Sequence, residues 1–172
     1  MLTARIPSPL TSTRFSGRPL LAKARLERHP RQNITGVDIS PVMLEVAKKK
    51  LQAYSQIKLY NASVSALPLD YRSFDLVICA NAFHYFENPQ LALSKMKRVV
   101  KPNGTTIILD WCRDYPMLQL WHYLFKFIDP AYRQCYTQRE LEQLLADTGF
   151  DVVKVAKMRF GFIWELMVIS SI

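Results

Sequence analysis

The sequence predicts an α/β domain with a largely parallel sheet and helices on both of its faces. Short apolar segments that fit buried strands alternate along the chain with segments of helical spacing. One of them, Phe74–Ala80, is apolar almost throughout, as a strand covered on both faces must be. Two helix candidates begin with a capping residue and a proline, at Ser40-Pro41 and Asn88-Pro89. Ligands of such folds bind at the carboxyl ends of the strands.

The first residues of the chain predict little regular structure. Residues 1–18 mix Pro, Ser, Thr and Arg with few large apolar side chains, so we expect a disordered or atypical tail. Residues 19–172 then form one predicted domain, since nothing in them indicates a linker or a repeat. Pro19 opens a helix candidate over 20–29, and Pro30 ends it.

Three strands and two helices are predicted next. Apolar residues predict strands at 33–38 and 57–60. The helix between them has one apolar face, formed by Met43, Val46, Ala47 and Leu51. After the strand at 74–80, the helix opened by Asn88 has a buried stripe of Ala92, Leu93, Met96, Val99 and Val100.

The last third of the chain continues the alternation and ends in a hairpin. Pro102-Asn103-Gly104 predicts a turn before a strand at 105–110. The aromatic stretch 111–128 is interpreted mainly as core and cap, and its helix places four apolar residues on one side: Trp121, Leu124, Phe125 and Ile128. Thr137 and Glu140 form a capping box for a helix that Gly149 closes. Strands at 152–155 and 162–169 predict an antiparallel hairpin around Gly161.

Charge, hydrophobicity and cysteine content argue against several classes of protein. The net charge is +9, but residues 1–31 hold seven basic residues and one acid, so the remaining 141 carry only +3. This distribution favours a solvated surface over a nucleic-acid groove. No apolar run is long enough for a membrane span. The odd, widely spaced cysteines and the unpatterned histidines predict no disulfide framework and no metal site, and a cytoplasmic location fits.

Asp38 is the sharpest functional signal. It ends a predicted buried strand and precedes a capped helix, where a carboxylate can accept both hydroxyls of a ribose. Ile39 and Met43 offer apolar surface for an adenine ring. A plain acid beside the positive end of a helix explains the position equally well.

Four segments between Val37 and Gly104 decide between these alternatives. In order, they are Val37-Asp38-Ile39-Ser40-Pro41 with Met43-Leu44 and Ala47, Ala66-Leu67-Pro68, Ser73-Phe74-Asp75-Leu76-Val77, and Arg98-Val99-Val100-Lys101-Pro102-Asn103-Gly104. Together they resemble the class I S-adenosylmethionine-dependent methyltransferases, in the subgroup that acts mostly on small molecules. The resemblance implies a Rossmann-like sheet, S-adenosyl-L-methionine as cofactor and a small-molecule methyl acceptor as partner. The oligomeric state stays open.

The resemblance also assigns cofactor contacts. Asp38 matches the acid that binds the cofactor ribose, and Ile39 matches the residue that packs on adenine. Ser63 lies where relatives place a polar residue near the adenine amino group, and Val64 would offer its backbone N–H to the ring. Ala80 follows the family's fourth strand, whose backbone contacts the methionine part.

The methyl-transfer site is implied by the segment that follows Ala80. Asn81 to Tyr85 lies where relatives shape this site, and Trp111 is a further candidate at its rim, so Asn81, Tyr85 and Trp111 are expected to contact the acceptor. His84 could remove a proton from the acceptor as a neutral imidazole. A loop residue that only shapes the pocket remains the alternative for His84, because methyl transfer to a good nucleophile depends mostly on alignment.

The sequence departs from the family at its first strand. The family ends that strand in a glycine-rich turn that lets the backbone approach the methionine portion of the cofactor. No two of the five glycines here share such a loop, and only Gly17 sits near its expected end. The apolar strand before it, central in the family's sheet, is missing or replaced. Either the tail supplies a poor substitute strand, or its neighbours close together, or the chain folds badly.

Three other functions compete with an active methyltransferase. The missing glycine turn also predicts an inactive methyltransferase-like fragment. Asp38 would serve a nicotinamide-dependent oxidoreductase equally well, although no G-x-G-x-x-G is present. A nucleic-acid-binding module would depend on the basic residues of 1–31.

Overall fold

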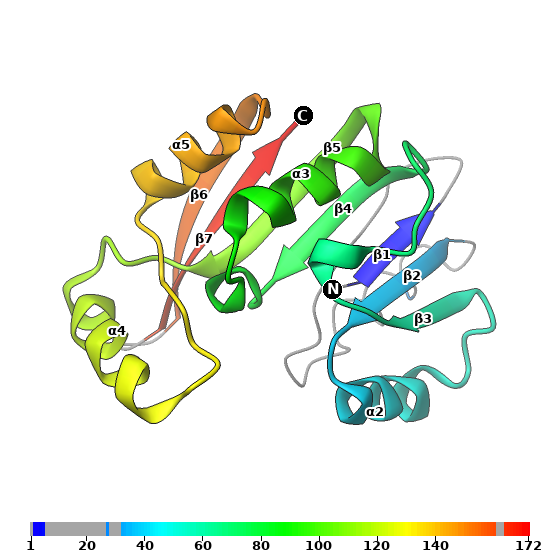
Figure 1. Ribbon diagram of the computed structural model, residues 1–172, viewed down its shortest axis with the longest axis horizontal. Helices are drawn as coiled ribbons and strands as arrows, with labels where there is room; N and C mark the ends of the chain where they lie inside the picture. The colour runs from blue at the N-terminus through cyan, green and yellow to red at the C-terminus, as the bar shows by residue number, and fades with distance from the viewer. Residues whose placement is uncertain (1, 6–26, 28–31, 161–163) are drawn as a thin grey trace.

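Seven strands form one sheet in the computed structural model, which describes residues 2–5, 27, 32–160 and 164–172 (Figure 1). The strands are β1 (Leu2–Arg5), β2 (Asn33–Asp38), β3 (Ile57–Asn61), β4 (Phe74–Ala80), β5 (Val100–Trp111), β6 (Val152–Phe160) and β7 (Trp164–Ser171). Their order in the sheet is β3-β2-β1-β4-β5-β7-β6. Gly17, Gly161 and all but one residue of the predicted 20–29 helix lie outside the described residues.

Helices connect most of the strands. They are α2 (Pro41–Leu51), α3 (Pro89–Val99), α4 (Pro116–Ile128) and α5 (Gln138–Asp147), with short 3-10 turns η1 (Val64–Ala66) and η2 (Phe83–Tyr85). β2 pairs with β3, and β4 with β5, in parallel, whereas β6 and β7 form the predicted antiparallel hairpin. The predicted α/β class is therefore confirmed. The prediction of a largely parallel sheet was wrong, because β1 and the hairpin make four of the six strand pairings antiparallel.

β1 occupies the place of the family's missing central strand. It pairs antiparallel with both neighbours, so that Leu2 lies opposite Gly36 of β2 and Ile78 of β4. Of the three outcomes expected for this gap, the structure has the tail supplying a substitute strand. Because β1 runs against β2 and β4, its last residue, Arg5, lies opposite Asn33 at the amino end of β2. β1 therefore ends at the edge of the sheet opposite the carboxyl ends of the parallel strands.

The predicted helix starts are confirmed by their capping hydrogen bonds. The Ser40 hydroxyl accepts from Met43 N (3.3 Å), and the Asn88 side-chain oxygen accepts from Leu91 N (2.8 Å). Thr137 and Glu140 form the full capping box of α5. Gly149, at φ 77°, has the left-handed conformation expected just beyond a helix.

Two further sequence predictions were wrong. Pro102–Gly104 does not end an element: β5 runs through it, and the pairing with β4 jumps from Val100 to Thr105, so a bulge absorbs the extra residues. In α4 the predicted apolar side is not the buried one, because Ile128 is 63% exposed whereas Leu118 is 2% exposed. Apolar side chains make up most of this helix, so several of them stay exposed whichever side is buried.

Hydrophobic packing covers both faces of the sheet. The main core joins β4, β5 and β7 to α3 and α5, with Phe83 and Leu93 fully buried in it. A second cluster packs α2 on β2 through Ile34, Ala47 and Leu51. Ile34 and Val37 belong to different clusters and lie three positions apart on β2, so they point to opposite faces.

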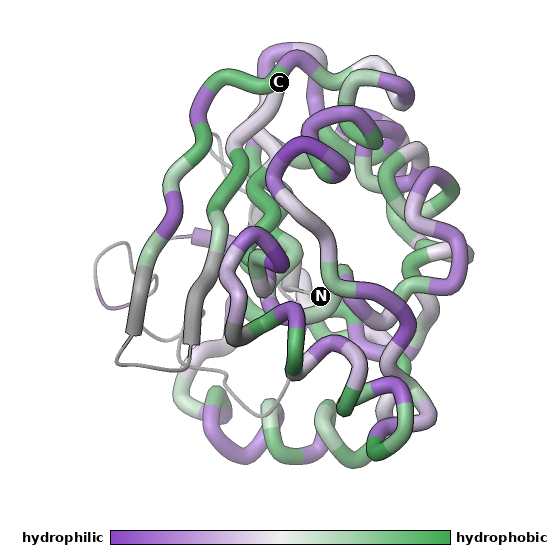
Figure 2. Tube along the Cα trace, turned by 90° about the vertical axis from the view of Figure 1, so that its left-hand side faces the viewer, coloured by the Kyte–Doolittle hydropathy of each residue, from purple (hydrophilic) through white to green (hydrophobic). Residues whose placement is uncertain are grey.

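The outer strand β6 carries exposed charged side chains. Its hydrophobic positions are interrupted by hydrophilic ones along one side of the molecule (Figure 2), where Lys154 and Lys157 are exposed. Charged residues on an outer strand discourage pairing with another chain. Within the described residues, no helix has the length and apolar character needed to cross a membrane.

Candidate functional site

Two predicted site residues, together with Asp110, lie where parallel strands end. Asp38 is the last residue of β2, Asn81 follows the last residue of β4, and Asp110 lies one residue before the end of β5. Parallel strands bring their carboxyl ends to one edge of the sheet, and this edge is the usual ligand-binding edge of such folds.

Asp38 is held in place by backbone contacts. Its side chain is buried, and Oδ1 accepts a hydrogen bond from Ser40 N (2.9 Å). The amide of Asn61 donates to the carbonyls of Asp38 (3.0 Å) and Ile39 (2.9 Å), which fixes the turn after β2. Among the described residues, none donates to the buried Oδ2 of Asp38. A buried oxygen without a donor is costly unless a ligand completes it, so this atom indicates a binding site.

A cavity of about 490 Å³ opens beside Asp38. Its lining includes four other predicted residues, namely Ile39, Ser63, Val64 and Tyr85. Ile39 is 58% exposed, which is unusual for an isoleucine and suits an apolar ring. Ser63 caps the turn η1 by accepting from Ser65 N (3.3 Å). The volume lies in the range of ordinary small-molecule sites.

Other predicted residues do not line this cavity. Met43 packs against the second hydrophobic cluster, and Ala80 is buried at the end of β4. Asn81 has φ 47°, a strained value for a residue other than glycine, and within the described part of the chain its buried Oδ1 has no partner. Strain and an orphaned acceptor together are typical of a ligand-contacting turn.

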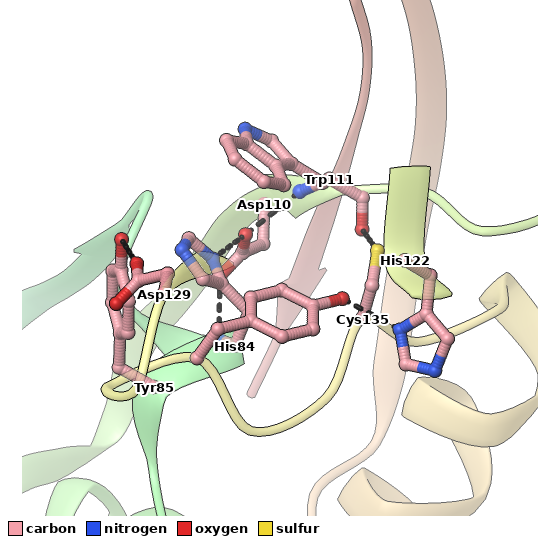
Figure 3. Close-up of polar contacts among 8 residues, drawn as sticks. His84, Tyr85, Asp110, Trp111, His122, Asp129 and Cys135 are labelled. Carbon is pink, nitrogen blue, oxygen red and sulfur yellow. Dashed lines mark hydrogen bonds and ion pairs between the residues drawn. The ribbon is translucent and has the colours of Figure 1, made fainter. Parts of the chain in front are cut away.

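His84 and Asp110 form a buried pair (Figure 3). His84 Nδ1 lies 2.6 Å from Asp110 Oδ1, and Asp110 also accepts from the backbone N–H groups of His84 (3.1 Å, Oδ2) and Trp111 (2.7 Å, Oδ1). An ionised carboxylate only accepts, so Nδ1 carries the proton and Nε2 is the basic nitrogen. The pair thus holds an imidazole in one tautomer and one orientation.

Aromatic rings surround the imidazole. Trp111 stacks on His84 with ring centroids 4.7 Å apart and planes 13° apart, and Tyr85 lies at 4.1 Å. Trp111 in turn contacts Phe125 of α4 at 5.2 Å. Tyr85 forms part of the cavity wall, whereas His84 packs against the Tyr85 ring without lining the cavity itself. The predicted acceptor-site residues Tyr85 and Trp111 are therefore brought together around His84.

A segment after α4 completes this wall. The His84 carbonyl accepts from the N–H groups of Arg133 (3.0 Å) and Gln134 (3.1 Å), and Tyr85 donates to Asp129 (3.2 Å). Arg133 and Glu87, joined by an ion pair of 2.8 Å, both line the cavity. These two residues could not be found from the sequence, because they lie 46 positions apart and belong to no motif.

The thiols near the site are unsuited to nucleophilic catalysis. Burial raises the pKa of the Cys112 thiol to about 11, and burial raises the pKa of the Cys135 thiol still further. Both stay protonated near neutral pH, and only the thiolate is a good nucleophile. In the parts of the chain that the structure covers, no three His, Cys, Asp or Glu residues are grouped to hold a metal ion.

Acid is expected to destabilise the fold through His122. Burial, together with the nearby charges of Lys126 and Arg113, lowers the pKa of His122 below its ordinary 6.5. Below about pH 6.5 the imidazole therefore binds a proton in the unfolded state but not yet in the folded state. The free energy of unfolding falls as the pH falls from 6.5 towards the folded-state pKa of His122. We expect the melting temperature to drop between pH 7.5 and 5.5, and to drop less in His122→Gln. Equal drops in the two proteins would contradict this assignment.

Comparison with known proteins gives a consistent result. A family model described as a methyltransferase domain matches residues 16–108, more than half of the chain. A curated relative, demethylmenaquinone methyltransferase from Staphylococcus aureus (strain JH9), is 30% identical over 152 residues. That alignment covers 77% of this chain and 63% of the relative, so the chain spans less than two thirds of the relative's length.

Solved structures show the same fold. The YcgJ protein from Bacillus subtilis superposes with a TM-score of 0.74 at 14% identity, covering 94% of this chain and 90% of that one. A SAM dependent methyltransferase from Aquifex aeolicus superposes with a TM-score of 0.71 at 18% identity, covering 94% and 80%. At these identities the likeness concerns the fold alone.

Proposed function

The chain belongs to the class I S-adenosylmethionine-dependent methyltransferases, and on that premise we propose that it transfers a methyl group from this cofactor to a small-molecule acceptor. The observation that carries the proposal is the buried Oδ2 of Asp38. Asp38 lines the cavity, and this oxygen has no donor among the described residues. A ribose hydroxyl is a donor of the right kind for a carboxylate at the end of such a strand.

The residues around the cavity fit the rest of the cofactor's nucleoside. The exposed side chain of Ile39 would pack on the adenine ring, while Ser63 and the backbone N–H of Val64 would bind its polar edge. Asn81, with its orphaned Oδ1, and the backbone of Ala80 would meet the cofactor's remaining portion. Met43 supports the site from the neighbouring cluster, and Gly17 stays a candidate outside the described residues.

When bound, S-adenosylmethionine supplies a methyl group already activated by the positive sulfur. The protein's part would be to align the acceptor and to receive its proton. His84 is the proposed base: Nε2 would take the proton of an acceptor hydroxyl or similar group, and Asp110 would stabilise the resulting imidazolium. Tyr85 and Trp111, stacked around His84, would contact an apolar or aromatic acceptor.

The remaining parts of the proposal concern binding partners, cellular location and domain organisation. We propose a cytoplasmic protein without a nucleic-acid partner. Its single domain consists of residues 19–172 together with β1, the short strand that the predicted tail over 1–18 contributes to the sheet. Cys79, Cys112 and Cys135 are thiols rather than disulfides, which suits a reducing compartment.

Replacing Asp38 by Asn is expected to weaken binding of S-adenosylhomocysteine, the cofactor's product, by about 10- to 100-fold. Hydrogen bonds to a charged group contribute about 1.5–3 kcal/mol, and each 1.4 kcal/mol is about tenfold in affinity. Isothermal titration calorimetry on the full chain measures this, with Asp151→Asn, an exposed carboxylate outside the cavity lining, as the control.

Three results would point elsewhere. Equal affinities of wild type and Asp38→Asn would remove Asp38 from the site. No heat from the wild-type chain at high ligand concentration would favour the inactive-fragment alternative. Fluorescence quenching by NADH without binding of S-adenosylhomocysteine would favour an oxidoreductase.

A further inference from the structure

The cavity beside Asp38 has two chemically different walls. The segments after β2 and β3 supply one wall, which includes Asp38, Ile39 and Ser63. The segments after η2 and α4 supply the other, which includes the opposite charges of Glu87 and Arg133. The first wall suits a nucleoside, whereas the second suits a ligand group that carries both a positive and a negative charge.

The side chains of Glu87 and Arg133 can each exchange their mutual ion pair for a bond to a ligand. Its side chains are 80% and 44% exposed, and an exposed pair of this kind contributes little to folding stability. Each group can therefore leave the other for a ligand at small cost. Arg133 also donates to the Pro130 carbonyl (2.8 Å), which keeps its guanidinium at the rim.

The backbone that carries Arg133 is fixed. Its N–H donates to the carbonyl of His84, and the His84 side chain is bound to the buried Asp110. Tyr85, next in the chain, donates to Asp129 of the same segment. A charge on a fixed backbone loses less entropy when it binds than one on a free loop does.

We propose that Glu87 and Arg133 bind the amino-acid portion of the cofactor, with Arg133 on its carboxylate and Glu87 on its ammonium group. This inference rests on the proposed function. The sequence has no glycine-rich turn of the family's kind, because no two of its five glycines share one such loop, and these two side chains would supply the contacts that the turn supplies in the family. Two side-chain charges take the role that backbone N–H groups have in the family.

The test compares two ligands that share a nucleoside and a thioether. S-adenosylhomocysteine carries the amino-acid portion, and 5′-methylthioadenosine lacks it. Calorimetry on the full chain measures the affinity of each ligand. Arg133→Gln is expected to weaken the binding of S-adenosylhomocysteine about tenfold or more and to leave the binding of 5′-methylthioadenosine unchanged. Glu87→Gln should do the same more weakly, because its carboxylate is the more exposed. Lys48→Gln removes an ion pair of similar exposure outside the cavity lining and should change neither affinity.

Each other result overturns the inference in a recognisable way. If the wild type binds both ligands and Arg133→Gln weakens neither or both equally, the ion pair does not bind the amino-acid portion, and the proposed function stands. If the wild type binds neither ligand, the proposed function fails and the inference fails with it.

Discussion

Replacing Asp110 by Asn is expected to lower the rate of methyl transfer by about 100-fold or more, the usual contribution of a positioned base. Both carboxylate oxygens accept from backbone N–H groups, Oδ1 from Trp111 and Oδ2 from His84. An amide has only one oxygen, so in either orientation its NH₂ group faces an N–H donor. If that NH₂ faces Nδ1 of His84, the imidazole must change tautomer and Nε2 ceases to be basic. The lost hydrogen bond should also reduce stability by about 1–3 kcal/mol.

A purely structural role for Asp110 is separable from this expectation. If His84 and Asp110 act together in catalysis, the variants His84→Asn, Asp110→Asn and the double variant should lose similar activity. The effects of substituting residues that act together do not add. The pH–rate profile should flatten on its acid side when His84 is removed, and ¹⁵N spectra should show Nδ1 protonated in the wild type. Unchanged kcat in folded Asp110→Asn protein, with only a lower melting temperature, would reduce the pair to a structural contact.

Replacing Phe83 by Ala is expected to cost about 3–5 kcal/mol of unfolding free energy, the usual cost of truncating a buried phenylalanine. Phe83 is fully buried, and its ring meets Phe86 and Tyr136 edge-on at 5.4 Å each. Domains are typically stable by only about 5–15 kcal/mol, so this variant should be close to unfolding. Urea denaturation measures the loss.

The matched control for this prediction is Phe127→Ala. Phe127 lies on α4 and is 87% exposed, so its truncation should change stability by less than about 0.5 kcal/mol. Similar losses in the two variants would mean that the ring of Phe83 is not part of the core that the structure describes.

Local signals in the sequence predicted most of the elements. The hydroxyl of Ser40, the amide of Asn88 and the Thr137–Glu140 box each satisfy backbone N–H groups within four residues, so their effect is visible in a short window. Asp38 was found because a strand end and a helix start meet there. These features need no knowledge of the tertiary structure.

Features set by distant contacts were not predictable in the same way. The direction of β1 depends on two neighbours, β2 and β4, far along the chain, and its four residues carry no pattern that selects one direction. The Glu87–Arg133 pair depends on a segment held to η2 by backbone hydrogen bonds. Pro102–Gly104 carries strong turn residues, but pairing with β4 on either side keeps it within a strand.

The position of β1 also couples ligand binding to folding. β1 is the strand that joins β3 and β2 to the other four, and it does so with four residues. Asp38 ends β2, on one side of β1, while Arg133 and Glu87 belong to the part of the chain on the other side of β1. A ligand held by both would act as a cross-link between the two parts of the sheet. By mass action, a ligand at 100 times its Kd adds about 2.7 kcal/mol of stability to the folded state, so cofactor supply would set how much of this chain is folded.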